Sequence, residues 1–142
     1  RVGNYVFHNL SYMDDVLKAE LEKRNVELIN IRQGYAKCSI SIVDENSIIT
    51  SDKGIAKAGL DKGLDVLLIE PEKAIRLHEL EYGFIGGSTG LLDRNLWALS
   101  GSLENLDSKS LIKDFLQKKG IQPISLYDGS VTDIGSLIPI GL

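Results

Sequence analysis

The sequence predicts an α/β protein built from repeated β-β-α-β units. Residues 34–51 align with residues 83–100 without a gap, at a constant separation of 49 positions. In both copies an Asp-x-Asn turn joins two apolar stretches, as expected for a hairpin. A helical pattern and a further short apolar run follow each hairpin. A fixed internal period of this length indicates a repeat architecture.

Identical residues at five aligned positions support the internal match. They are Gly34 and Gly83, Ser39 and Ser88, Asp44 and Asp93, Asn46 and Asn95, and Ser51 and Ser100. The same separation carries Ile85-Gly86 onto Ile134-Gly135, so residues 131–140 resemble the start of a third copy. Residues 4–8 resemble the second strand of an earlier copy. We therefore expect two and a half to three units of about 50 residues.

The first, partial copy begins with the expected strand 4–8 and continues into a helix. Ser11 and Asp14 resemble a capping box. Apolar residues then fall on one helical face: Met13, Val16, Leu17 and Leu21. The helix should end at residues 23–25, because cations suit the negative end of the helix dipole and Asn tolerates a left-handed cap. The apolar run 26–31 predicts a strand buried on both faces.

The two later copies repeat this order after their hairpins. In the first of them the helix should end at Lys62-Gly63, before a strand over residues 66–69. In the second, the apolar helical face is made by Leu111, Ile112, Phe115 and Leu116. That helix should end at residues 118–120, before a strand over residues 124–126. These short apolar runs again predict strands buried on both faces.

The repeat has a geometric consequence for the centre of the molecule. One such unit cannot bury its own helix face, so neighbouring units must pack around a common axis or in a row. With the helices outside, the first strand of each copy lines the inside. Three pairs then become equivalent positions that face a shared centre: Lys37-Cys38, Gly86-Gly87 and Gly135-Ser136.

Composition excludes several classes of protein. The 142 residues, 43% hydrophobic and 25% charged, suit one globular domain over residues 1–142. One cysteine and two histidines exclude a disulfide scaffold and the usual zinc sites, and we expect no metal or cofactor. A net charge of −4 argues against a nucleic-acid partner. No apolar run approaches the ~20 residues of a membrane span and no leader opens the chain, so we expect no membrane partner and a cytoplasmic location.

The order of segments from Asn4 to Ile140 resembles the C-terminal three-fifths of the pentein fold of arginine deiminases and dimethylarginine dimethylaminohydrolases. The strings Gln33-Gly34-Tyr35-Ala36-Lys37-Cys38 and Val131-Thr132-Asp133-Ile134-Gly135-Ser136 are similar to a family of bacterial proteins, largely Gram-positive, assigned to that fold without a known activity. The resemblance implies a propeller of five units around a pseudo-symmetric axis, of which about three are present. We expect either that N-terminal modules are missing from this chain or that copies associate through open strand edges.

The resemblance also implies where a guanidine-modifying site would lie. Those enzymes use a cysteine thiolate, a histidine and carboxylates that hold the cationic substrate. Tyr35-Ala36-Lys37 stands where their histidine precedes Leu-Lys, and Arg1-Val2-Gly3-Asn4 stands where acids flank Gly-Gly. Gly135-Ser136 stands where their cysteine lies. Three such losses predict that guanidine hydrolysis is absent, and Arg1 would repel an arginine-like cation.

We therefore expect a non-catalytic pentein-like protein that acts as a binding or structural module. A small polar ligand at the axis would meet six side chains: Tyr35, Lys37, Ser88, Thr89, Asp133 and Ser136. The alternative is a hydrolase or transferase of a guanidino- or amide-type small molecule, with Cys38 or Ser136 as nucleophile. In that case Lys37 would favour the reactive thiolate of Cys38.

Each of these features also has a purely structural interpretation. A lone cysteine in an apolar strand is most often a small buried hydrophobe. Alternation along such a strand would place Lys37 and Cys38 on opposite faces, so both could not easily serve one site. The glycine-rich segment 83–90 lacks the ending of a phosphate loop and precedes a strand, so its glycines are expected to let strands approach closely.

Overall fold

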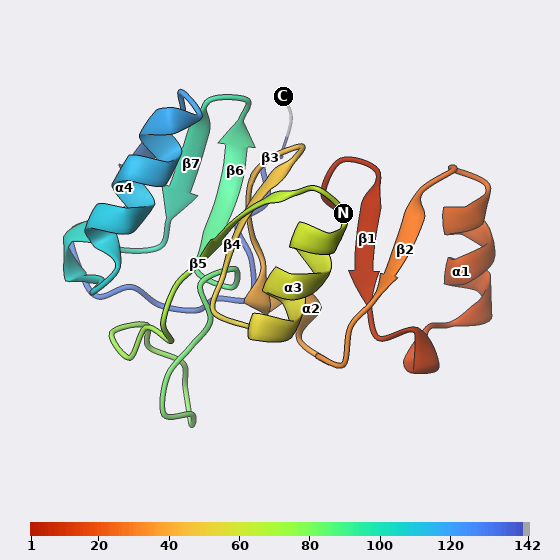
Figure 1. Cartoon of the computed structure of the whole chain (residues 1–142). Helices are drawn as coiled ribbons and strands as arrows, with labels where there is room; N and C mark the ends of the chain where they lie inside the picture. The colour runs from red at the N-terminus through yellow and green to blue at the C-terminus, as the bar shows by residue number, and fades with distance from the viewer. Residues whose placement is uncertain (141–142) are drawn as a thin grey trace.

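The computed structural model describes residues 1–140 as a row of three small sheets with helices packed between and beside them (Figure 1). The first sheet pairs β1 (Tyr5–His8) with β2 (Glu27–Asn30) in parallel. A 3-10 turn, η1 (Leu10–Tyr12), and helix α1 (Asp15–Glu22) connect these two strands. This is the β-α-β order expected for the partial first copy.

The second unit begins with a short helix, α2 (Ala36–Ser39), where the sequence predicted the start of a strand. An antiparallel hairpin follows, made of β3 (Ser41–Asp44) and β4 (Ser47–Thr50). Helix α3 (Lys53–Asp61) then leads to β5 (Asp65–Leu68), which pairs in parallel with β4. The strand order in this sheet is β3-β4-β5.

The third unit has the same order of elements. Its hairpin is β6 (Thr89–Asp93) and β7 (Leu96–Leu99). A 3-10 turn, η2 (Leu103–Asn105), and helix α4 (Lys109–Lys118) lead to β8 (Gln122–Ser125), which is parallel to β7. Ignoring the turn, both units are of the β-β-α-β type.

The two hairpins share their register. Ile42 pairs with Ile48 in one, and Leu91 pairs with Trp97 in the other, each 49 positions further along the chain. Both hairpins carry the same irregularity immediately before the turn, between Ile42 and Asp44 and between Leu91 and Asp93. The separation found in the sequence is therefore also the separation of paired residues in the two sheets.

Local capping explains where the helices begin and end. Asp14, not Ser11, caps α1: its carboxylate accepts hydrogen bonds from the amides of Val16 and Leu17. Ser11 lies in η1 instead, so the predicted capping box is wrong. The predicted left-handed ends are confirmed at Asn25 (φ 50°) and, after the later helices, at Gly63 and Gly120.

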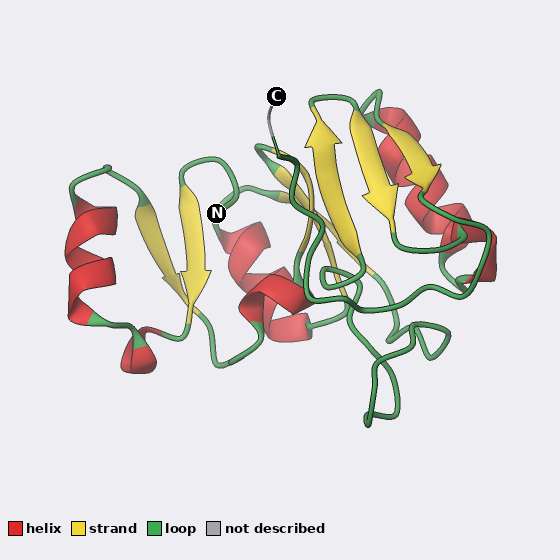
Figure 2. Ribbon diagram, turned by 180° about the vertical axis from the view of Figure 1, so that it is seen from behind, coloured by secondary structure: helices red, strands yellow, loops and turns green. Residues whose placement is uncertain are grey.

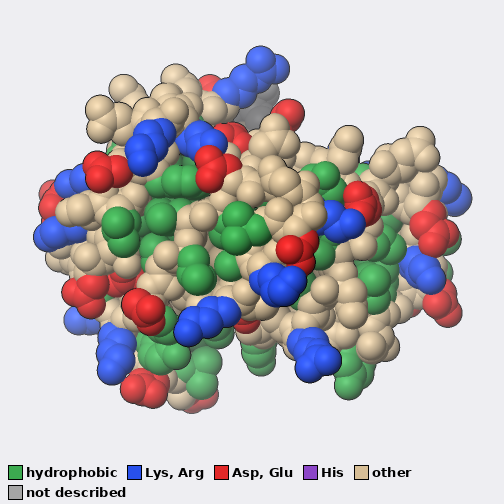
Figure 3. Space-filling model, in the orientation of Figure 1, with side chains coloured by type: hydrophobic (Ala, Val, Ile, Leu, Met, Phe, Trp, Pro, Cys, Tyr) green, Lys and Arg blue, Asp and Glu red, His purple; other side chains and the backbone are tan. Residues whose placement is uncertain are grey.

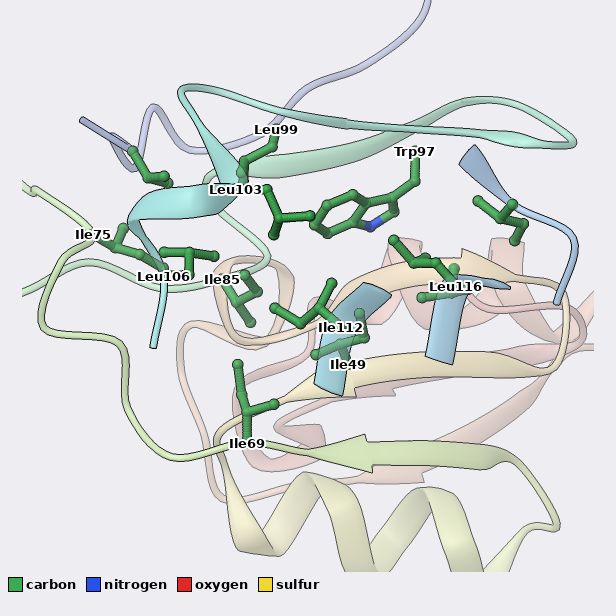
Figure 4. Close-up of a cluster of buried hydrophobic side chains, with 13 residues drawn as sticks. Ile49, Ile69, Ile75, Ile85, Trp97, Leu99, Leu103, Leu106, Ile112 and Leu116 are labelled. Atoms are coloured by element: carbon green, nitrogen blue, oxygen red, sulfur yellow. The ribbon is translucent and has the colours of Figure 1, made fainter. Parts of the chain in front are cut away.

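The core consists of two hydrophobic clusters, each formed where a helix lies between two sheets. Ile55 of α3 packs with Phe7 and Ile29 of the first sheet and with Ile48 of the second. The larger cluster places Ile112 and Leu116 of α4 between β4 and β7, beside the buried Trp97 (Figure 4). The Trp97 indole also donates to the Ser41 hydroxyl at 2.9 Å, which joins the last two sheets.

Several expectations about burial and extent are wrong. In β8 every residue is exposed and β2 buries only Ile29, so these strands are not buried on both faces. Residues 131–140 form one isolated bridge, Arg76 to Thr132, rather than a strand. Within residues 1–140 the three sheets do not close into a ring.

The helices are short, and side chains of both charges share the surface drawn in Figure 3. The longest helix in residues 1–140 has 10 residues, and no helix there is long and apolar enough to cross a membrane. Acidic and basic side chains intermingle over the face drawn in Figure 3. The expected lack of a nucleic-acid partner remains a prediction.

Candidate functional site

Three segments far apart in the sequence meet at the middle of the molecule. The Gly87 amide donates to the Cys38 carbonyl at 3.0 Å, and the Ile134 amide donates to the Gly87 carbonyl at 3.1 Å. The Cys38 thiol lies 3.7 Å from the Gly135 carbonyl. The three pairs expected to face a shared centre, Lys37-Cys38, Gly86-Gly87 and Gly135-Ser136, therefore belong to segments in mutual contact. We call these segments the central cluster.

Lys37 extends from α2 across the central cluster. Its ammonium donates to the Gly86 carbonyl at 3.2 Å. Partial burial lowers the pKa of this ammonium below its ordinary 10.5, while Asp133, and Cys38 when it is ionised, act in the opposite direction. No carboxylate lies within ion-pair distance of Lys37 in residues 1–140. The charge is therefore only partly compensated.

Cys38 is half-buried on the same helical turn as Lys37. The expectation that strand alternation separates the two side chains is wrong, because the segment is helical. Burial raises the pKa of the Cys38 thiol above its ordinary 9.0, Asp133 raises it further, and Lys37 opposes both. Since burial is the largest effect, the thiol is protonated at neutral pH and Lys37 does not turn it into a reactive thiolate.

Asp133 is a buried carboxylate that ties two segments of the central cluster together. It accepts hydrogen bonds from the amides of Phe84 and Gly135, both at 2.9 Å. A side chain at Gly87 would overlap this carboxylate, and one at Gly86 would overlap the Ile40 carbonyl. Glycine is needed at both positions because the backbones lie so close.

The remaining predicted ligand residues divide into exposed and internally bonded groups. Tyr35 is exposed and stacks on Phe84 with 6.0 Å between ring centroids. The buried hydroxyls of Ser88 and Thr89 bond to the Ile85 carbonyl, at 3.0 and 2.8 Å, so they serve the fold. The buried Ser136 hydroxyl has no hydrogen-bond partner in the described part of the chain.

A small hollow opens beside Lys37, between the N-terminal segment, α2 and β3. Its volume is about 80 Å³. Its lining residues are Arg1, Val2, Phe7, Ala36, Lys37, Ile40 and Ile42. The lining therefore includes two residues with cationic side chains among apolar ones and contains no acidic residue. The Arg1 guanidinium donates to the Gly3 carbonyl at 2.6 Å and to the Asn4 side chain at 3.4 Å. We call it the Lys37 hollow.

Sequence reasoning did not identify this hollow. It noted Arg1 only as the loss of an acid, and it did not connect Val2 or Phe7 with Lys37. The contact depends on how the first sheet packs against α2, for which the sequence carries no local signal. The sequence offered two hints of a cationic site. Arg1 replaces an acid of the resembled enzymes, and Lys37 was predicted to face the centre.

Neither histidine belongs to the three segments of the central cluster. His8 lies 2.9 Å from the carbonyl of its neighbour Asn9, and His78 is exposed beside Glu79. Neither histidine is bonded to Cys38 or Ser136. Residues 1–140 contain no group of three or more metal-ligating side chains.

Comparison with known proteins gives a family but no described relative. Residues 1–138 match a family described as a family of unknown function, DUF6873. No curated protein and no solved structure matches the chain. The chain belongs to the DUF6873 family.

Proposed function

We propose that this DUF6873 member is a non-catalytic, pentein-like module that binds a small anion in the Lys37 hollow. Three features support the pentein-like arrangement. The hairpins share a register at a separation of 49, each later helix packs between neighbouring sheets, and the inner segments of successive units meet. A common axis through the central cluster accounts for all three.

The absence of a working nucleophile supports a binding role over catalysis. Tyr35 stands where the resembled enzymes carry histidine, and neither histidine of the chain contacts Cys38. The raised pKa keeps the Cys38 thiol protonated. A Ser136 hydroxyl without an adjacent base is a weak nucleophile at neutral pH. These observations disfavour the alternative hydrolase or transferase.

The proposal that the ligand is anionic rests on the cationic residues around the Lys37 hollow. Arg1 and Lys37 border it, and its other walls are apolar, which strengthens attraction to a negative group. Lys37 remains exposed, and partial desolvation lowers the pKa of its ammonium, so a negative group bound beside it would favour the charged form. A cationic guanidinium would be repelled by both side chains.

The size of the hollow narrows the chemical class. The hollow is small, about 80 Å³, and partly open to solvent. A carboxylate is a negative group small enough to enter it. The ligand is then a small carboxylate, or a larger molecule that inserts its carboxylate end.

Thermal unfolding with matched probes tests the proposal. Acetate should raise the melting temperature of the chain, while acetamide, its neutral isostere, and agmatine, a guanidinium cation, should not. Chloride keeps ionic strength constant. Substitution Lys37→Met should abolish the acetate effect because it removes the ammonium. The matched control Lys53→Met changes an exposed lysine on α3 and should preserve it.

Two results would contradict the proposal. Equal stabilisation by acetate and acetamide would show that the charge of the ligand is not recognised. An acetate effect that survives in Lys37→Met would place the binding elsewhere. Release of ammonia or urea from an arginine-like compound by the pure protein would instead support the catalytic alternative.

A further inference from the structure

The interface between α4 and the middle sheet shows how units of this chain pack on one another. Ile49, Leu67 and Ile69 lie on the face of the sheet β3-β4-β5 that turns toward α4. Ile112 and Leu116 of α4 close this face, and Figure 4 shows them beside Ile49. Each sheet of this type therefore presents a second apolar face to the helix of the following unit.

The last sheet carries an equivalent face that no helix within residues 1–140 covers. Ile49 pairs with Leu67, and its counterpart Ala98 pairs with Ile124. Ile69 donates its amide to Thr50, and Leu126 donates in the same way to Leu99. By these pairings Ile124 is the counterpart of Leu67, and Leu126 is the counterpart of Ile69.

Exposure separates the two equivalent faces. Ile69 is 4% exposed under α4, whereas Leu126 is 48% exposed and Ile124 is 39% exposed. The segment after β8 covers the β6 side of this face, where Leu137 lies against Gly90, and Ala98 of β7 is fully buried, so the exposed part lies along β8. Figure 2 shows the sheet β6-β7-β8 from this side, with α4 behind it and no helix in front. We call the part around Ile124 and Leu126 the open sheet face.

At the opposite end of the molecule, helix α1 lacks a sheet on its outer side. Val16 is 71% exposed and Leu17 is 43% exposed, although the sequence places both on the apolar face. α1 buries no residue, whereas α3 and α4 each bury residues between two sheets. Figures 1 and 2 both show α1 at the end of the row, with β2 on one side only.

We propose that α1 of one copy of this chain docks on the open sheet face of a second copy. The contact between α4 and the middle sheet is the model for this docking. In that contact, too, the helix of one unit packs on the apolar sheet face of the unit before it. The contact is head to tail: it uses different surfaces on the two partners, so it can extend or close into a ring. It covers apolar side chains that are otherwise exposed at both ends.

Sedimentation velocity over a concentration series, with variants at each end, tests this docking. The unmodified chain should shift from monomer to larger species as its concentration rises. Val16→Asp disables the helix surface, and Ile124→Asp disables the sheet surface, so each variant alone should stay monomeric. An equimolar mixture of the two retains one intact pair of surfaces and should form a dimer and nothing larger.

Controls separate docking from misfolding. Leu60→Asp changes an exposed leucine on α3 and should associate like the unmodified chain. Circular dichroism and melting temperature check that each variant folds, and Leu17→Asp and Leu126→Asp provide a second pair. An unmodified chain that stays monomeric at every concentration would overturn the proposal. Association that survives in either single variant, or a variant mixture that stays monomeric, would also overturn it.

Discussion

At the scale of single residues, burial rather than neighbouring charge determines the chemistry of the central cluster. The sequence places Lys37 beside Cys38, and an adjacent cation generally favours a thiolate. The structure adds two effects that the sequence cannot show, desolvation of the sulfur and the nearby Asp133 carboxylate, and both raise the pKa of the thiol. The combined effect keeps the thiol protonated at neutral pH.

This balance predicts the reactivity of Cys38. At pH 7.5, iodoacetamide should alkylate Cys38 more slowly than glutathione, because a raised pKa leaves a smaller fraction of the thiol ionised, and the higher nucleophilicity of the thiolate offsets only about half of this effect. Asp133→Asn removes a negative charge, which should lower the pKa and speed alkylation. Lys37→Met removes the opposing cation, which should raise the pKa and slow it. Mass spectrometry follows the reaction, and a rate above that of glutathione would contradict the account.

At the centre of the molecule, the sequence predicted residue types where closely spaced backbones require glycine. The sequence indicated that Gly86 and Gly87 allow close approach, and a side chain at either position would overlap neighbouring atoms. It did not indicate that Ser88 and Thr89 use their hydroxyls within the fold, because Ile85, their shared acceptor, offers a backbone carbonyl. Expected contact with a ligand stays a prediction for all six residues: Tyr35, Lys37, Ser88, Thr89, Asp133 and Ser136.

At the scale of elements, periodicity predicted the helices well, but partners distant in sequence fixed their ends. The beginning of α4 illustrates the difference. Ser108 precedes the helix without a side-chain cap, and the buried Glu72 accepts hydrogen bonds from the amides of Asp107 and Ser108 instead. Glu72 lies 36 positions before Ser108, so no local motif reveals this interaction.

Loss of this contact should destabilise the fold. Glu72→Ala leaves two amides at the start of α4 without their acceptor, at a cost of about 1–3 kcal/mol in the free energy of unfolding. Glu70→Ala, which changes an exposed glutamate nearby, should cost little. Urea denaturation measures both. Equal stability of the two variants would show that the Glu72 carboxylate does not hold the helix.

The sequence pattern did not predict the short helix α2. Residues 34–43 carry the β-forming composition of their counterpart, yet residues 36–39 are helical and the counterpart residues 85–88 form turns. Packing decides this segment: the Gly87 amide bonds to the Cys38 carbonyl, and the Ser39 carbonyl accepts from the Thr50 hydroxyl at 2.7 Å. Tertiary contacts therefore override the local preference.

At the scale of the whole molecule, the internal repeat was the most informative feature of the sequence. It predicted the order of elements in both complete units and three equivalent positions facing a shared centre, because equal spacing places equivalent residues at equivalent positions. It did not predict which faces stay open. Exposure of Val16 and Ile124 depends on what lies beside each unit, and a repeat pattern carries no such information.

The most direct test of the proposal that the Lys37 hollow binds an anion is an NMR titration of the ¹⁵N-labelled chain with acetate, with acetamide as the reference. The account predicts saturable shifts of amide signals, concentrated in residues 2–7 and 36–42 around the Lys37 hollow, with acetate only. Shifts that are the same with acetamide, or that spread over the surface without saturation, would contradict it.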